Sequence, residues 1–181
     1  DYLIVKSTNL TQAWNVYVKG VTTTNAQYFR LNESNGIYTT VNPRFIPGNF
    51  NDNVFSIGSD NACNGNNDDY IAYCFRSISG YSKVGTYTST GATGSSNEIT
   101  TGFQPRFLLV KASSHSEDWY LFDSERLNLS GGTNDGLLFA NSSATENTGY
   151  DRITFSSTGF YWNTAYGGNS NGYTYFYLAI A

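Results

Sequence analysis

Apolar and polar residues alternate over short stretches along this chain, which predicts β-strands from one end to the other. The stretches are rich in Val, Ile, Tyr, Phe and Thr, and Asn-, Gly- and Ser-rich turns separate them. No stretch has the period of an amphipathic helix of ordinary length. We therefore predict an all-β, antiparallel β-sandwich. The expected strands are residues 2–6, 14–18, 27–32, 53–58, 70–75, 83–88, 106–111, 119–123, 136–141, 152–155, 159–162 and 174–180.

The opening stretch DYLIVKSTNLTQAW has a counterpart, RFLLVKASSHSEDW, and the two align at an offset of 105 residues. Leu3, Val5, Lys6 and Trp14 recur as Leu108, Val110, Lys111 and Trp119. The strand at 70–75 matches 175–180 at the same offset, and residues 29–34 match 138–143 after a slip of four. This pattern predicts two pseudo-symmetric repeats, 1–75 and 106–181, joined by a hairpin and a Gly/Ser/Thr loop in 76–105. Units this small rarely support separate cores, so we expect one compact domain or a tight tandem.

The last strand of each repeat is apolar on both faces. Ile71, Tyr73 and Phe75 share the face that we expect to be the core. The other face is apolar too, which indicates packing between the copies or against a partner. The alternative is a half-exposed sheet whose tyrosine hydroxyls reach water.

The composition excludes several classes of function. Charged residues make up 13% of the chain, and 10 Lys and Arg against 14 Asp and Glu give a net charge of −4 without a basic run. Nucleic-acid binding needs a phosphate-neutralising basic surface, so we expect none. No apolar stretch reaches 18 residues, so we expect no membrane insertion. The chain has no Met, even at position 1, which suggests a processed product or a piece of a longer polypeptide.

The segments DYIAYCFRSISGYSKVGTYTSTG, TGFQPRFLLVKASSHSEDWYLFDSER and YTYFYLAIA together carry a resemblance. They resemble a repeat-containing β domain of structural proteins of bacteriophages, notably those of marine and cyanobacterial hosts. The resemblance covers nearly the whole chain, although Ser89 and Thr90 intervene where the family pattern closes sooner. It implies a virion protein of tail-fibre or other surface-exposed type, without known catalytic residues.

Candidate catalytic groups are sparse. The single histidine, His115, lies among Ser114, Ser116, Glu117 and Asp118, too close in sequence for a nucleophile–base–orienter geometry. A glycosidase needs two acids across a cleft, which sequence alone leaves open for distant acids. We predict no enzyme, with glycan cleavage as a minor alternative. The distant acids are Asp123, Glu125 and Asp151.

Two features of the loop SDNACNGNNDD concern metal and thiol chemistry. Its oxygen ligands suit Ca²⁺, although an Asn/Gly-rich turn explains them equally well. The candidate ligands are Asp60, Asn64, Asp68 and Asp69. Cys63 lies in this loop and Cys74 in the next strand. Free thiols are favoured over a bridge, because Cys74 aligns with a buried-looking Ala179 and phage proteins assemble in a reducing cytosol.

Asn-x-Ser/Thr sequons occur at Asn9, Asn32, Asn128 and Asn141. In a chain so rich in Asn, Ser and Thr they are expected by chance. Carbohydrate on Asn32 and Asn141 would contradict the phage interpretation.

Aromatic and amide side chains near the C-terminus form a candidate glycan site, because aromatic faces pack on sugar rings and amides bond hydroxyls. Its members are Tyr161, Trp162, Tyr166, Asn169, Asn171 and Tyr173. The alternative places Trp162 in the core and makes the loop a long turn. Specificity is expected where the repeats differ, in 60–69, 91–96 and 163–172.

Two functions remain as hypotheses. The first is a surface-exposed tail-fibre or receptor-binding module on the virion, in contact with other virion proteins and with host glycans. The second is a capsid decoration or extracellular fibril subunit with a purely structural role, which self-associates into a homo-oligomer such as a trimer. A fold by itself assigns neither.

Overall fold

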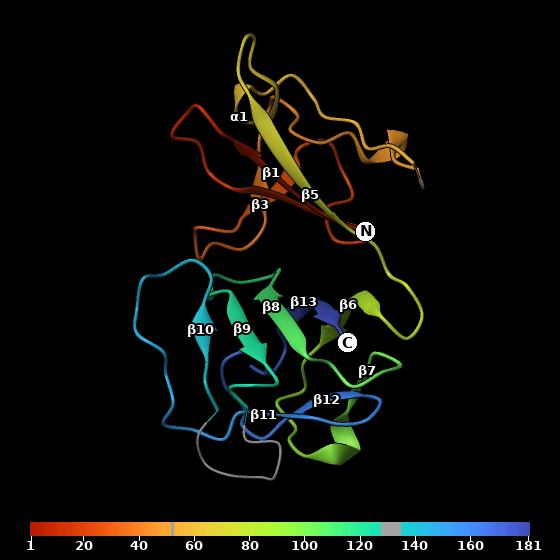
Figure 1. Cartoon of the computed structure of the whole chain (residues 1–181), viewed down its shortest axis with the longest axis vertical. Helices are drawn as coiled ribbons and strands as arrows, with labels where there is room; N and C mark the ends of the chain where they lie inside the picture. The colour runs from red at the N-terminus through yellow and green to blue at the C-terminus, as the bar shows by residue number, and fades with distance from the viewer. Residues whose placement is uncertain (52, 128–134) are drawn as a thin grey trace. The chain divides into compact units, whose positions relative to one another are not determined.

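A computed structural model describes residues 1–51, 53–127 and 135–181 of the chain (Figure 1). Antiparallel strands dominate these residues, which confirms the all-β prediction. The chain forms two compact units, Asp1–Phe75 and Arg76–Ala181. In the described residues, no helix is long and apolar enough to cross a membrane.

The first unit contains one five-stranded sheet with the order β4-β3-β2-β1-β5. Its strands are β1 (Tyr2–Ser7), β2 (Asn15–Val18), β3 (Gln27–Arg30), β4 (Tyr38–Thr39) and β5 (Tyr70–Phe75). The chain between β4 and β5 contains the short helices η1 (Pro47–Asn49) and α1 (Asn61–Asn64). Strand alternation turns Leu3, Val5 and Tyr17 to one face, where Phe45 and Cys63 of this connection pack on them.

The second unit is a two-layer sandwich. One sheet has the order β10-β9-β8-β13-β6 and the other the order β11-β12-β7. The strands are β6 (Ser82–Thr88), β7 (Ile99–Thr100), β8 (Phe107–Ala112), β9 (Tyr120–Asp123), β10 (Leu138–Phe139), β11 (Ile153–Phe155), β12 (Gly159–Trp162) and β13 (Thr174–Ile180), with η2 (Ser95–Asn97) before β7. The smaller sheet packs against the larger one, and apolar side chains of both sheets form one core.

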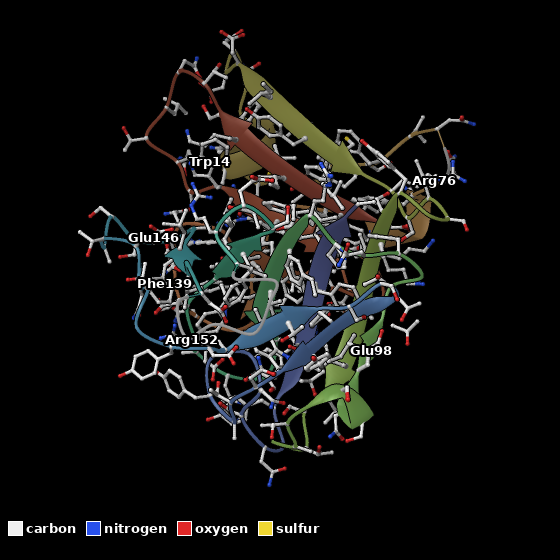
Figure 2. All side chains as sticks on the ribbon, turned by 60° about the horizontal axis from the view of Figure 1, so that its bottom comes forward. Trp14, Arg76, Glu98, Phe139, Glu146 and Arg152 are labelled. Carbon is white, nitrogen blue, oxygen red and sulfur yellow. The ribbon has the colours of Figure 1, made fainter. Side chains whose placement is uncertain are left out.

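The segment 76–105, expected as a connection between repeats, is built into the second unit. β6 pairs with β13 along the whole of both strands, from Ser82 opposite Ile180 to Thr88 opposite Thr174. β7 pairs with β12, and Glu98 just before β7 (Figure 2) accepts hydrogen bonds from Ser156 and Thr158 at 2.7 and 2.6 Å. This segment therefore contributes one strand to each layer of the sandwich.

The two five-stranded sheets share a pairing register. Leu3 lies opposite Cys74 and Tyr17, and Leu108 lies opposite Ala179 and Phe122. Every pair of β1 with β2 and β5 thus has a counterpart in the pairs of β8 with β9 and β13, at the offset of 105 seen in the sequence. The pairing of β2 with β3 matches that of β9 with β10 after the slip of four. The strand order β3-β2-β1-β5 therefore corresponds to β10-β9-β8-β13.

Some strand predictions were wrong. Residues 53–58 form no strand, and only an isolated bridge joins Ile57 to Phe45. The expected strand at 136–141 is reduced to Leu138–Phe139. The strand β4 was missed, because two residues are too few to show a period. The hairpin expected in 76–105 is not formed, since β7 pairs with β12 and not with β6.

The expected core face of β5 is also wrong. Ile71 and Tyr73 are each 41% exposed, whereas their counterparts on β13, Phe176 and Leu178, are buried. Cys74 is exposed too, although it aligns with a buried alanine. Trp14 (Figure 2) is half-buried and stacks on Tyr73, with ring centroids 6.1 Å apart. In the part of the chain that the structure describes, β13 pairs on both edges, while β5 pairs with β1 alone, which accounts for part of this difference.

We expect Gly168→Ala to destabilise the second unit more than Gly172→Ala does. Both glycines have a positive φ, which costs other residues about 1–2 kcal/mol. A Cβ at Gly168 would also overlap the buried ring of Trp162, while a Cβ at Gly172 meets open space, so Gly168→Ala adds an overpacking cost of about 1–3 kcal/mol. Urea unfolding of both variants measures the difference. Equal losses would show that the Trp162 ring moves aside freely.

Candidate functional site

A polar pocket of about 350 Å³ opens on the first unit. Its volume is at the lower end of the range for small-ligand sites. The residues that line it come from the β1–β2 loop, the end of β3 with the following turn, and the connection after β4. They are Thr11, Gln12, Ala13, Arg30, Asn32, Glu33 and Arg44.

Asn32 joins two walls of this pocket. Its Oδ1 accepts a hydrogen bond of 2.9 Å from the backbone N–H of Trp14. Next to it, the backbone N–H of Leu31 donates to the carbonyl of Trp14 at 2.9 Å. The β1–β2 loop is therefore held against the turn after β3, and the backbone at the pocket is fixed before any ligand arrives.

Arg30, Glu33 and Tyr38 form a hydrogen-bonded group on one side of the pocket. Arg30 Nη1 donates to Glu33 Oε1 at 2.9 Å, and the Tyr38 hydroxyl donates to Glu33 Oε2. Burial would raise the pKa of Glu33, but the hydrogen bonds from Tyr38 and Arg30 outweigh burial and lower it. Burial, then the bond to Glu33, raises the pKa of Tyr38 to about 12. Glu33 is thus held as a carboxylate.

Arg44 forms the buried wall of the pocket, with 8% of its surface exposed. Its Nη1 donates to Asn15 Oδ1, and its Nε lies 3.4 Å from Asp60 Oδ2, an ion-pair distance without good hydrogen-bond geometry. The guanidinium lies over the ring of Tyr28, 3.8 Å from its centroid. A planar cation stacked on an aromatic ring and fixed at two edges is rigid, so Arg44 can serve as an oriented donor surface.

The corresponding place in the second unit is arranged differently. Asn141 matches Asn32: its Oδ1 accepts from the N–H of Trp119 at 2.8 Å. Its Nδ2 donates to Asp118 Oδ1 at 2.8 Å, whereas the first repeat has Ala13 at the position of Asp118. Phe139 (Figure 2) replaces Arg30. The carboxylate and the ring remove the features that make the first pocket open and basic.

The pocket offers both donors and acceptors to a ligand. Guanidinium groups and amides can donate, while Glu33 and Thr11 can accept. Glu33 is the single carboxyl among the lining residues, and glycosidases need a pair. Such a lining can form hydrogen bonds to a ligand that carries both donors and acceptors.

The predicted glycan residues are not all available to a ligand. Trp162 is 1% exposed and belongs to the core of the second unit, and Asn169 is buried, with its amide bonded to the carbonyls of Ala92 and Thr164. These two side chains stabilise the fold and offer little surface to a ligand. Tyr161 and Tyr173 are half-buried, while Tyr166 and Asn171 are exposed, and these four stay predictions.

The predicted calcium ligands do not converge. Asp60 caps α1 by accepting from the N–H of Ala62 at 2.8 Å, and it pairs with Arg44. The Asn64 amide donates to the carbonyl of Gly58 at 2.8 Å. Asp68 is half-buried and Asp69 is exposed. In the described residues, no group of three or more His, Cys, Asp or Glu side chains is placed to hold a metal.

The remaining candidate groups have structural contacts. The exposed His115 lies flat on the ring of Tyr173, with centroids 3.5 Å apart. Ser114 Oγ lies 2.9 Å from His115 Nδ1, and Glu117 accepts hydrogen bonds from Ser170 and Tyr175 at 3.1 and 3.0 Å. Cys63 and Cys74 are free thiols, and burial raises the pKa of Cys63 to about 12.

The sequons have mixed outcomes. Asn32 and Asn141 use their amide oxygens to bind the backbone of Trp14 and Trp119, which gives these asparagines a structural role. Asn9 Oδ1 accepts from the N–H of Asp69 at 3.2 Å. Asn128 lies outside the described residues.

The sequence-based search missed the pocket. The residues that line it lie outside the three ranges in which specificity was expected, 60–69, 91–96 and 163–172. Asp60, in the first of these ranges, contributes through its ion pair with Arg44. One signal was present: in the aligned repeats, Ala13 stands opposite Asp118 and Arg30 opposite Phe139. These two differences set the repeats apart at the pocket, but the contribution of Arg44 depends on tertiary packing.

Known proteins add one match. No curated protein and no solved structure matches this chain. A family described as "Domain of unknown function (DUF7483)" matches residues 1–181. The chain therefore belongs to this DUF7483 family.

Proposed function

We propose that this chain is a non-enzymatic structural domain on the surface of a phage particle, of tail-fibre or receptor-binding type, and that it binds a host glycan. The pocket of the first unit carries this proposal. It combines a buried, stacked guanidinium with an amide, a hydroxyl and a fixed carboxylate. These groups match the alternating donors and acceptors of sugar hydroxyls.

Two further observations support an extracellular or virion-surface setting. The chain has few charged residues and many uncharged hydroxyl and amide groups, and its sequence resembles phage structural domains over nearly the whole length. Binding without cleavage agrees with the state of Glu33, whose carboxylate is occupied by Arg30 and Tyr38. A general acid for glycoside cleavage needs the opposite, a raised pKa.

The test is Ala13→Asp, which gives the first repeat the acidic residue of the second. The new carboxyl can bond the Asn32 amide as Asp118 bonds Asn141, and it closes the pocket. On a glycan array the unmodified chain should bind at least one glycan class. The variant should bind it about tenfold more weakly or worse, a loss of about 1.4 kcal/mol.

Asp118→Ala is the matched control in the second unit and should bind as the unmodified chain does. Gln12→Ala gives a second variant of the pocket, because its side chain lines the pocket and is half-buried. Binding that is unchanged in both pocket variants would exclude this pocket. An array without any bound glycan would contradict the function itself.

A second candidate function is a structural subunit, a capsid decoration or extracellular fibril component that self-associates. The exposed outer edge of β5 favours it, because it is a long apolar strand without a partner strand in the described residues. Such edges are the usual template for pairing between chains.

A further inference from the structure

The outer edge of β5 differs from every other sheet edge of the described chain. β4 and β10 are two residues long, β7 has two residues and β11 three, and β6 contains Lys83. β5 has six residues, YIAYCF, without charge or proline. Short length and charge are the devices by which proteins protect sheet edges, and β5 has neither.

In the second unit, the strand that corresponds to β5 has a further strand paired along its outer edge. β13 occupies the position of β5, and its outer edge is paired in full with β6, antiparallel. The hydrogen bond from Ser89 N to Tyr173 O, 2.8 Å, sets the phase of this pairing. Since hydrogen-bonded pairs alternate along a ladder, Tyr175, Tyr177 and Ala179 direct their backbone groups toward β6.

The same argument fixes the outward groups of β5. The bond from Thr8 N to Asp69 O, 2.8 Å, extends the β1–β5 ladder, so Ile71, Tyr73 and Phe75 direct their backbone groups toward β1. Their neighbours direct N–H and C=O outward. These neighbours are Tyr70, Ala72 and Cys74, the counterparts of the three β13 residues that bond β6.

We propose that β5 pairs antiparallel with β5 of a second copy of this chain, around a two-fold axis at Ala72. Only residues whose backbone N–H and C=O point outward can form hydrogen bonds between the two chains. The register must therefore place even-numbered residues of β5 opposite even-numbered residues of the partner. With Ala72 opposite itself, Tyr70 lies opposite Cys74 of the partner, and each pair exchanges two backbone bonds. The smallest side chain of the strand falls at the axis, where the two chains meet.

This register also covers the exposed apolar side chains. Ile71 of each chain lies opposite Tyr73 of the other, so two such pairs form on one face of the joined sheets. Both residues are 41% exposed in the single chain, and Trp14 already stacks on Tyr73. Aromatic and branched side chains opposite each other are favourable cross-strand pairs. An isologous interface of this kind gives a closed dimer through β5, and a larger assembly would need a second interface.

The oligomeric state of the full chain tests this proposal. Light scattering after size exclusion, over a concentration series, should give twice the 20.0 kDa mass of one chain. The double variant Ile71→Lys/Tyr73→Lys should be monomeric, because four like charges would meet at the interface. Val41→Lys/Val54→Lys, at two other exposed positions, is the control and should stay dimeric. Circular dichroism checks that all of them fold.

A disulfide trap tests the register. Ala72→Cys in a Cys74→Ser background should form an intermolecular disulfide on oxidation, because the two Cα atoms lie within bridging distance in a hydrogen-bonded pair. The native Cys74 should not form one, since it lies opposite Tyr70. A monomeric native chain, or a dimer that survives the lysines, would overturn the interface, and a trap through Cys74 instead would overturn the register. Glycan binding plays no part in these measurements.

Discussion

Trp162→Ala should lower the free energy of unfolding by about 3–5 kcal/mol, the range for large aromatic truncations in cores. The indole packs edge-on against Phe122 of β9 and Phe160 of β12, with centroids 5.9 and 6.2 Å away. It therefore joins the two layers of the sandwich. Urea unfolding followed by far-ultraviolet circular dichroism measures the loss.

Tyr166→Ala is the control for this truncation. Its side chain is 71% exposed in the loop after β12, so the change in stability should stay within about 0.5 kcal/mol. A Trp162→Ala variant that kept full stability but lost glycan binding would restore the tryptophan as a ligand contact. Such a result would contradict its assignment to the core.

Arg44→Ala should cost about 3–5 kcal/mol, because it removes one partner of a buried charge pair. Asp60 keeps only 16% of its side chain exposed, and Asn15 is fully buried, with its Oδ1 bonded to Arg44. Truncation removes the cation that faces the Asp60 carboxylate and the donor that bonds the Asn15 amide oxygen, and both acceptors stay desolvated. Thermal unfolding at a fixed pH, together with glycan binding of the variant, measures both consequences.

Arg126→Ala is the matched control for Arg44→Ala. Arg126 faces the carboxylates of Asp123 and Glu146, but 44% of its side chain is exposed. Water screens exposed pairs, so this variant should lose about 0–1 kcal/mol. If the two variants lost equal stability, the burial of Arg44 would not be the cause of its large effect.

Much of the fold could be predicted from the sequence, because strand period and turn residues are local signals. The strands at 70–75, 159–162 and 174–180 have the observed bounds. The strand expected at 53–58 is absent because Ile57 packs on the core of the first unit from a connecting segment, while Val54 and Phe55 are exposed. Burial by a distant segment leaves no period in the sequence.

The candidate site could be predicted only in part. The chemistry of Asp60 was noticed, but as a calcium ligand, because a carboxylate in an Asn/Gly loop looks the same whether a cation or an arginine faces it. Arg44 lies 16 residues before Asp60 and meets it only after the connection folds onto the sheet. The aromatic glycan residues were chosen by type, and type alone did not separate a core indole from an exposed tyrosine.

The sequence by itself determined the all-β class and the recurrence at 105 residues, because strand period, turns and aligned residues are properties of neighbours along the chain. Only the tertiary structure decided which faces are covered. β5 and β13 have similar sequences, yet β5 is largely exposed and β13 buried. In the described residues, β13 pairs with β6 as well as with β8, and the smaller sheet packs on its face with Tyr175 and Tyr177, whereas β5 pairs with β1 alone. It also brought Arg30, Glu33 and Arg44 together, since a pocket depends on contacts between residues distant in sequence.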